Sequence, residues 1–209
     1  LKMVAAIYAI LTPIAAIALG VLAYVGNVNY WREEFYRYNV YSNFGKFRLV
    51  DIQAQDLSYY LLGNGKLDQY FYNEKERQHL ADVKLLLARA EAIFWVNTIV
   101  LSLFSFFYSH NGYKKRLAAG LMTGAYSLLT VVLITLIFGV LSFSNAFEML
   151  HKIFFTNDLY ILDPSTDNLI RMFPQDFFID TILRIDLALI TMSFVLYVAS
   201  LSIKKTKSD

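Results

Sequence analysis

Residues 117–141 read LAAGLMTGAYSLLTVVLITLIFGVL and contain no charged side chain. The hydrocarbon core of a bilayer is about 30 Å thick, and an α-helix needs roughly 20 apolar residues to cross it. This stretch is long enough to do so, and it predicts a helical membrane protein. Three further apolar stretches qualify, and we expect transmembrane helices at residues 1–25, 91–109, 117–141 and 179–203.

The composition supports a membrane protein. Of the residues, 57% are hydrophobic and only 17% are charged, which is too apolar a balance for an ordinary soluble domain. The net charge of +2 comes without a basic block interleaved with aromatic residues, so nucleic-acid binding has little support. Cysteine is absent, so we expect no disulfides, no thiolate metal site, no cysteine acyl-enzyme and no lipid anchor on this chain.

The positions of lysine and arginine predict how the chain crosses the membrane. Short cytoplasmic loops carry an excess of these residues, and both the loop at 110–116 and the tail at 204–209 are basic. We therefore expect a multi-pass plasma-membrane protein with both termini in the cytoplasm and with residues 26–90 and 142–178 outside. The predicted fold is an all-α membrane protein whose four transmembrane helices are joined by two extracytoplasmic segments that form a small cap.

The first extracytoplasmic segment, 26–90, includes the start of the second span's helix. Asn73 is a good helix N-cap, and Glu76 follows three residues later, as in a capping box. No proline or glycine lies between 73 and 109, so one unbroken helix is expected there. His79 and Asp82 share a face of it because they are spaced i, i+3, although such a histidine can equally be a solvated residue. Earlier in the segment, we expect a short strand at 47–52 and helical turns at 56–62.

The second extracytoplasmic segment, 142–178, holds His151 three residues after Glu148. Asn157 and Asp163 lie in stretches whose Asn, Asp and Pro residues favour turns. Arg171 follows within the apolar run LIRMFP at 169–174. An arginine in that setting needs a carboxylate or substrate oxygens, unless it snorkels to lipid headgroups.

The chain lacks the familiar motifs of nucleophilic, metal and phosphate-binding chemistry. It has no G-x-S-x-G elbow, no H-E-x-x-H helix and no glycine-rich phosphate loop. His79, Asp82 and His151 could in principle hold zinc, but the pattern is generic, and we expect neither a metal nor a cofactor. What remains is general acid–base catalysis by two histidines, because histidine titrates near neutral pH.

Two motifs resemble those of a known family. They are RQHLADV at 77–83, and FEMLH at 147–151 followed by Asn157, Asp163, Pro164, Asp167 and LIRMFP at 169–174. Together with the length and the four expected spans, they resemble the lipoprotein intramolecular transacylase family, Lit, over nearly the whole chain. The second motif is long and specific, and the first is weaker alone. The chain has Tyr160 where tryptophan is more usual in the family; both are interfacial aromatic residues, so the resemblance stands.

The resemblance implies an enzyme that moves the sn-2 acyl chain of a diacylglyceryl-modified lipoprotein to the α-amine of that lipoprotein's own N-terminal cysteine. Its product would be a lyso-form lipoprotein, as found in low-GC Gram-positive bacteria. The implied partners are a diacylated lipoprotein in the outer leaflet of the plasma membrane and membrane lipid, with no nucleic acid. We expect a monomer.

For this chemistry we interpret His79 as the base that takes the amine proton, with Asp82 as its orienting group. His151 is interpreted as the donor to the oxyanion or to the leaving oxygen, and the sequence leaves the two histidine roles interchangeable. The other residues predicted to orient groups or to bind glycerol ester oxygens are Arg171, Asn157, Tyr72 and Asp163.

Without the resemblance, three other classes of function stay open. The nearest is a membrane phospholipase or another lipid acyltransferase, which would release a fatty acid or use a separate acyl acceptor. A non-enzymatic membrane scaffold would tolerate the loss of both histidines. A transporter component is disfavoured, because transporters place ionisable residues at mid-span and the first three spans have none there.

Overall fold

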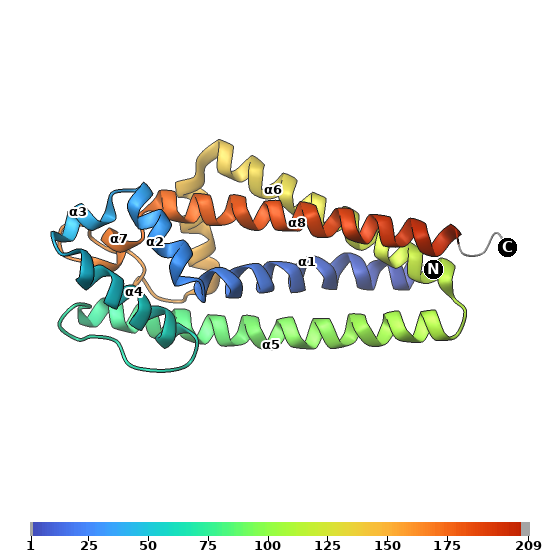
Figure 1. The fold of residues 1–209 in the computed structure, drawn as a ribbon, viewed down its shortest axis with the longest axis horizontal. Coiled ribbons are helices and arrows are strands. Elements are labelled where there is room, and N and C mark those ends of the chain that lie inside the picture. Colours follow the sequence, from blue (N-terminus) through green and yellow to red (C-terminus); the bar gives the residue numbers. More distant parts are fainter. Residues whose placement is uncertain (1, 206–209) are drawn as a thin grey trace. The chain divides into compact units, whose positions relative to one another are not determined.

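The computed structural model describes residues 2–205, apart from the side chains of Val140 and Leu141. Every regular element in this range is an α-helix, which confirms the predicted all-α membrane fold (Figure 1). The helices are α1 (Lys2–Val25), α2 (Val28–Arg37), α3 (Val40–Phe44), α4 (Phe47–Leu61), α5 (Glu74–His110), α6 (Lys114–Phe154), α7 (Asn168–Met172) and α8 (Gln175–Lys205). Residue 1 and the end of the predicted cytoplasmic tail, 206–209, lie outside the described residues.

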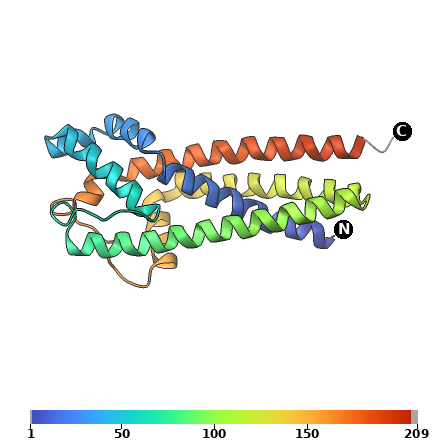
Figure 2. The same ribbon diagram turned by 60° about the horizontal axis from the view of Figure 1, so that its bottom comes forward.

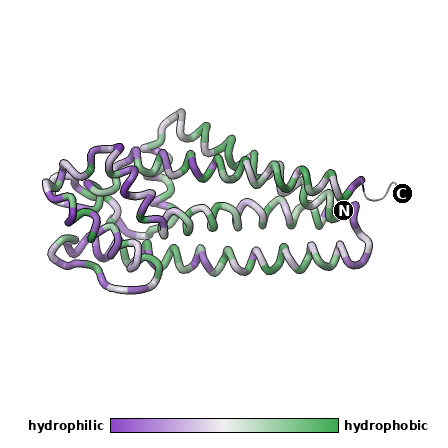
Figure 3. Tube along the Cα trace, in the orientation of Figure 1, coloured by the Kyte–Doolittle hydropathy of each residue, from purple (hydrophilic) through white to green (hydrophobic). Residues whose placement is uncertain are grey.

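Four helices are long and apolar enough to cross a membrane. They are Lys2–Val25, Glu74–His110, the Lys114–Gly139 part of α6, and Gln175–Lys205. Apolar residues dominate long stretches of these helices (Figure 3). Each predicted span overlaps one of them, and the membrane boundaries drawn from the sequence stay predictions.

Helix α5 carries the first histidine motif and is longer than a membrane is thick. Its 37 residues extend over about 55 Å, against about 30 Å of hydrocarbon. The part before residue 91 bears nearly all of its charged side chains, and its position outside the membrane stays a prediction from the sequence. The helix starts with the predicted capping box: Asn73 Oδ1 accepts the Glu76 N–H at 3.0 Å, and Glu76 Oε2 accepts the Asn73 N–H at 2.7 Å.

The chain divides into two compact units, and the first contains Leu1–Gly20, Glu91–Phe138 and Leu183–Asp209. Within it, glycines let two membrane helices approach closely. A Cβ added at Gly120 would lie 2.7 Å from Cδ2 of Tyr8, and one added at Gly124 would lie 2.9 Å from Oγ1 of Thr12. The contacts bring α1 alongside α6 (Figure 2).

The second unit contains Val21–Ala90 and Gly139–Ile182. Its core contains seven buried aromatic side chains, namely Tyr30, Trp31, Phe35, Phe71, Tyr72, Phe173 and Phe177. Helices α2, α3, α4 and α7 lie in this unit, together with the beginning of α5. The core therefore joins the two segments that the sequence predicts between membrane spans.

The strand expected at 47–52 is wrong, because these residues form the first part of α4. The expected helical turns at 56–62 fall on the same helix, which ends at Leu61. Val50, Ala54, Leu57 and Leu61 are buried, and their spacing of i, i+4, i+7 and i+11 places them on one helical face. Burial of this face against the aromatic core outweighs the weak preference of a short Phe-Arg-Leu-Val run for strand.

Helix α6 is interrupted at Ser142, whose φ of −174° and ψ of 97° are not helical. The residues that follow, 143–154, form a separate helical piece that belongs to the second unit and carries His151. Both histidine motifs therefore lie in the second unit.

Candidate active site

The structure brings together the two histidines that the sequence singles out. The imidazole ring centroids of His79 and His151 are 6.1 Å apart, and the ring planes are inclined by 33°. His79 comes from the first third of α5, and His151 from the piece of α6 after Ser142. A gap of this size between the ring centroids leaves both histidines in reach of one small reacting group.

His79 is buried and neutral. Only 6% of its surface is exposed, and burial lowers the pKa of His79 to about 4, with a further contribution from His151 that the nearby charge of Asp82 partly opposes. Its Nδ1 atom is buried and has no hydrogen-bond partner among the described residues. A buried, unpaired ring nitrogen is costly unless a bound molecule satisfies it, so this nitrogen is ready to bind a substrate group.

His151 is half-buried, and its ring has a defined orientation. Its Nδ1 lies 2.7 Å from the carbonyl oxygen of Phe147, one helical turn earlier. A carbonyl oxygen can only accept, so we assign the proton to Nδ1. In the neutral ring Nε2 then carries the lone pair, and it is available to take a proton.

Aromatic side chains enclose the pair. Phe155 lies edge-on to His79 with ring centroids 5.1 Å apart, and Tyr160 packs on His151 at 4.8 Å. Phe147 also contacts His151, with ring centroids 4.3 Å apart. This surrounding is apolar and suited to an acyl chain, while the two ring nitrogens supply the polar groups.

Asp82, which the sequence predicts to orient His79, is hydrogen-bonded to a different residue. Its Oδ2 accepts a hydrogen bond from Nδ2 of Asn157 at 2.9 Å, and its effect on His79 is electrostatic. Asn157 in turn accepts from the N–H of Leu159 at 3.2 Å. The two residues therefore tie α5 to the loop between Phe155 and Tyr160, which are the aromatic neighbours of the histidines.

Two other predicted residues serve the fold. Tyr72 is fully buried, and its hydroxyl donates to Sδ of Met172 at 3.6 Å, so the predicted contact with glycerol ester oxygens does not fit its position. Asp163 holds a turn: its Oδ1 accepts from the N–H and the hydroxyl of Ser165, at 2.8 Å and 2.7 Å. These bonds lower the pKa of Asp163.

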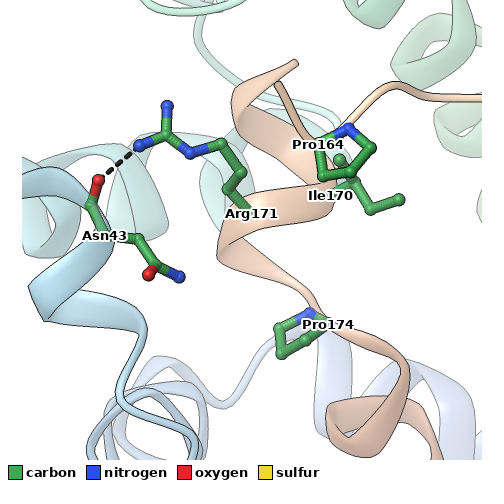
Figure 4. Close-up of a pocket in the computed structure, with 5 residues that line it drawn as sticks. All are labelled: Asn43, Pro164, Ile170, Arg171 and Pro174. Atoms are coloured by element: carbon green, nitrogen blue, oxygen red, sulfur yellow. Dashed lines mark hydrogen bonds between the residues drawn. The ribbon is translucent and has the colours of Figure 1, made fainter. Parts of the chain in front are cut away.

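Arg171 lines a pocket of about 340 Å³ together with Asn43, Pro164, Ile170 and Pro174. Its guanidinium donates to the backbone oxygen of Asn43 and, at 3.1 Å, to Oδ1 of Asn168, and it lies over the ring of Phe44 at 4.6 Å. Figure 4 shows the side chain reaching from α7 toward α3. These partners are neutral, so they orient the guanidinium without cancelling its charge.

Sequence reasoning missed the aromatic residues of the site. Phe147, His151 and Phe155 are spaced i, i+4, i+8, and this spacing indicates that they share one helical face. The sequence drew notice to Tyr160 only as a departure from the family motif, and no local pattern places it at His151, because a turn returns it there. Within residues 2–205, no group of three or more His, Cys, Asp or Glu residues is placed to hold a metal ion.

Known proteins resemble this chain in sequence and in fold. A family model described as "Lipoprotein intramolecular transacylase Lit" matches residues 6–178. An in meso structure of the membrane integral lipoprotein intramolecular transacylase Lit from Bacillus cereus has a TM-score of 0.87 and 20% identity, covering 99% of this chain and 96% of that chain. At this identity the structural likeness establishes the fold.

Two further structures of the Bacillus cereus protein, with a histidine-to-arginine and a histidine-to-alanine substitution, also match. Both have TM-scores of 0.81 and 19% identity, and cover 99% of this chain and 92% and 94% of their own chains. The comparison with curated proteins gives no match.

Proposed function

Because the chain belongs to the lipoprotein intramolecular transacylase family, we propose that it moves the sn-2 acyl chain of a diacylglyceryl-modified lipoprotein to the α-amine of the lipoprotein's N-terminal cysteine. Family membership makes the chain an acyltransferase that acts on lipoproteins in the membrane, and its four apolar helices make it a multi-pass membrane protein.

The reaction is aminolysis of an ester within one molecule. The α-amine attacks the sn-2 carbonyl carbon, a carbon–nitrogen bond forms, the carbon–oxygen bond to glycerol breaks, and the amine proton ends on the glycerol oxygen. The mass of the lipoprotein does not change. Donor and acceptor are already tethered, so the entropic cost of bringing them together is small, and no nucleophile of the enzyme is needed.

The observation that carries the proposal is the histidine pair, 6.1 Å between centroids, within an aromatic enclosure. An α-amine has an ordinary pKa of about 8, so it needs a base near neutral pH. The oxyanion of the tetrahedral intermediate needs a donor, and the glycerol oxygen needs a proton.

The sequence left open which histidine is the base, and the geometry favours His151 for this role in place of His79. The bond from Nδ1 of His151 to the Phe147 carbonyl leaves Nε2 with its lone pair, so we assign His151 as the base and, once protonated, as the acid for the glycerol oxygen. A pKa of about 4 keeps His79 neutral. An imidazole with so low a pKa is a weak base but donates well to an oxyanion without losing its proton, so we assign His79 to the oxyanion.

The aromatic enclosure supports transfer over hydrolysis. Phe155 and Tyr160 pack against the histidines, and an apolar surrounding that keeps water from the base leaves the tethered amine as the nucleophile that attacks the ester. The rival reading, a membrane phospholipase, needs a water molecule beside the base. The Asp82–Asn157 hydrogen bond serves this enclosure by holding the loop that carries both aromatic residues.

The predicted substrate-binding role of Arg171 remains part of the proposal. Its guanidinium is fixed by two neutral acceptors and keeps further N–H groups, beside a pocket of about 340 Å³. Carbonyl oxygens of the lipoprotein are suitable acceptors for these groups.

We also propose that the site faces the outer leaflet, that both termini are cytoplasmic and that the enzyme acts as a monomer. The basic loop that includes Lys114, Lys115 and Arg116 supports this orientation. The two histidine motifs lie in the segments at the opposite ends of their helices from this loop.

The test is tandem mass spectrometry of the N-terminal peptide of a diacylated lipoprotein after incubation with the enzyme. An unchanged mass with one acyl chain moved from glycerol to the cysteine nitrogen supports the proposal. Loss of one acyl mass would identify a lipase, and an unchanged peptide would reject both reactions. Exchange of labelled acyl chains between two lipoproteins would reject the intramolecular step.

A further inference from the structure

Four apolar side chains on the last part of α6 are exposed. Met149, Leu150, Ile153 and Phe154 are 45%, 42%, 65% and 54% exposed. They lie on the helical piece that follows the break at Ser142, and at about 100° per residue they occupy an arc of roughly 140° on one side of that piece. We refer to these four residues as the apolar stripe.

The other two sides of the same piece differ in character. Glu148 and Lys152 form an exposed ion pair with Oε1 and Nζ 2.6 Å apart. Phe147 and His151 point into the second unit, where they contact Phe178 and Tyr160. The piece therefore has an apolar side, a charged side and, between them, a side that carries the catalytic histidine.

This pattern is typical of a helix that lies in a membrane–water interface, with an apolar face in the acyl chains and a charged face in water. The piece is too short to span a bilayer, since residues 143–154 extend over about 18 Å and the hydrocarbon core is about 30 Å thick. In the chain it follows directly on a membrane-spanning helix, Lys114–Gly139, so its start is already at a membrane surface.

We propose that residues 143–154 form an interfacial helix whose apolar stripe inserts among the acyl chains of the bilayer. The partner is a lipid surface, chosen because the segment continues a membrane span and because its ion pair lies away from the stripe.

If the chain has the proposed function, the depth of this helix in the membrane also matters for catalysis. His151 lies beside the stripe on the same helical turns, so the depth of the helix fixes the depth of the catalytic nitrogen. An α-helix with its side chains is about 10–12 Å across. A helix with its stripe in the acyl chains therefore holds His151 near the level at which ester groups join acyl chains to glycerol.

The absence of cysteine from the chain gives a direct test. Single variants Ile153→Cys and Glu148→Cys carry a nitroxide spin label on the two opposite sides of the helix. The labelled full-length proteins are reconstituted in vesicles of phosphatidylcholine and phosphatidylglycerol. The collision rates of each label with oxygen, which concentrates in lipid, and with a water-soluble nickel chelate give its depth.

Two matched controls calibrate the scale. Ile99→Cys labels an exposed residue (56%) near the middle of the second span, and Ile52→Cys labels an exposed apolar residue (45%) on α4 of the second unit. We expect the label at 153 to favour oxygen over the chelate at a depth shallower than that of the label at 99, and the labels at 148 and 52 to favour the chelate.

Two results would overturn the proposal. If the label at 153 collides with the chelate as often as the label at 148, the stripe faces water. If it is immobile and shielded from both reagents, a second copy of the chain or another protein covers the stripe. Neither readout uses catalysis, so a failure here is distinct from a failure of the transacylase mechanism.

Discussion

His79 and His151 face each other with ring centroids 6.1 Å apart, although each is set by a different helix. His79 is held by the capped, charged beginning of α5, and His151 by the helical piece after Ser142. The same aromatic residue, Phe155, packs against both rings. The two histidines therefore form one site, and their variants are expected to behave as a unit.

The depressed pKa of His79 predicts sensitivity of the fold to acid. Its pKa is about 4 in the folded protein and about 6.5 in an unfolded chain, so the unfolded state binds more protons between these values. Stability is then unaffected above about pH 6.5 and falls as the pH drops toward 4, by about 2 kcal/mol at about pH 5. Thermal unfolding in detergent at about pH 7 and pH 5 measures this loss.

His79→Gln is the control for acid sensitivity, because glutamine does not titrate. The variant should lose less thermal stability than the wild type over the same pH interval. An equal loss in both proteins would show that other groups cause the acid sensitivity and that the pKa of His79 is not depressed.

The hydrogen bond between Asp82 and Asn157 is expected to affect catalysis by holding the loop between Phe155 and Tyr160 in place. Asp82→Ala and Asn157→Ala should each lower transfer by roughly tenfold to a hundredfold, and the double variant should be no worse than either single variant. Asp82→Asn keeps an oxygen that can accept from Asn157, so its rate should stay near that of the wild type. A pH–rate profile shifted in Asp82→Asn but not in Asn157→Ala would instead show that the charge of Asp82 acts on His79.

Tyr72 is expected to be dispensable for catalysis. Its ring is fully buried and its hydroxyl bonds only weakly to sulfur, so Tyr72→Phe should cost less than about 1 kcal/mol of stability and leave the transfer rate unchanged. Tyr160→Ala, which uncovers His151, should lower the rate by roughly tenfold or more. A large drop in kcat for Tyr72→Phe at normal stability would restore the substrate role predicted from sequence.

Close packing of α1 on α6 predicts a stability effect at Gly120. A methyl group there meets the ring of Tyr8, which cannot turn away freely because its hydroxyl lies 2.6 Å from Oγ of Ser105. Gly120→Ala should cost about 1–3 kcal/mol and lower the melting temperature. Gly139→Ala is the control, since apart from its chain neighbours and its own helix backbone no described atom lies within 4 Å of the added Cβ. Equal effects at both positions would contradict the packing account.

The sequence predicted those features that depend on local patterns. Apolar runs gave the four membrane helices, and the spacing of Asn73 and Glu76 gave the start of α5. It failed where tertiary contacts decide. Residues 47–52, predicted as a strand, are helical because α4 buries one face. Tyr72, predicted to bind substrate, is a buried core residue.

The partners of the polar site residues were also beyond local patterns. Asp82 bonds Asn157 in a distant loop, and Arg171 is held by a backbone oxygen of α3. Arg37 forms an ion pair with Asp180, with Nη1 and Oδ2 2.5 Å apart, across two segments far apart in the sequence. Such pairs follow from the packing of the second unit, which no periodicity encodes.

The central claim is that the two histidines carry out the transfer with different roles, and initial rates of acyl transfer for His79→Gln, His151→Gln and the double variant test it most directly. Glutamine can donate a hydrogen bond but cannot take a proton. We predict that His151→Gln lowers the rate by about a thousandfold or more and His79→Gln by less, with the double variant no worse than His151→Gln alone. A rate near that of the wild type for His151→Gln would contradict the account.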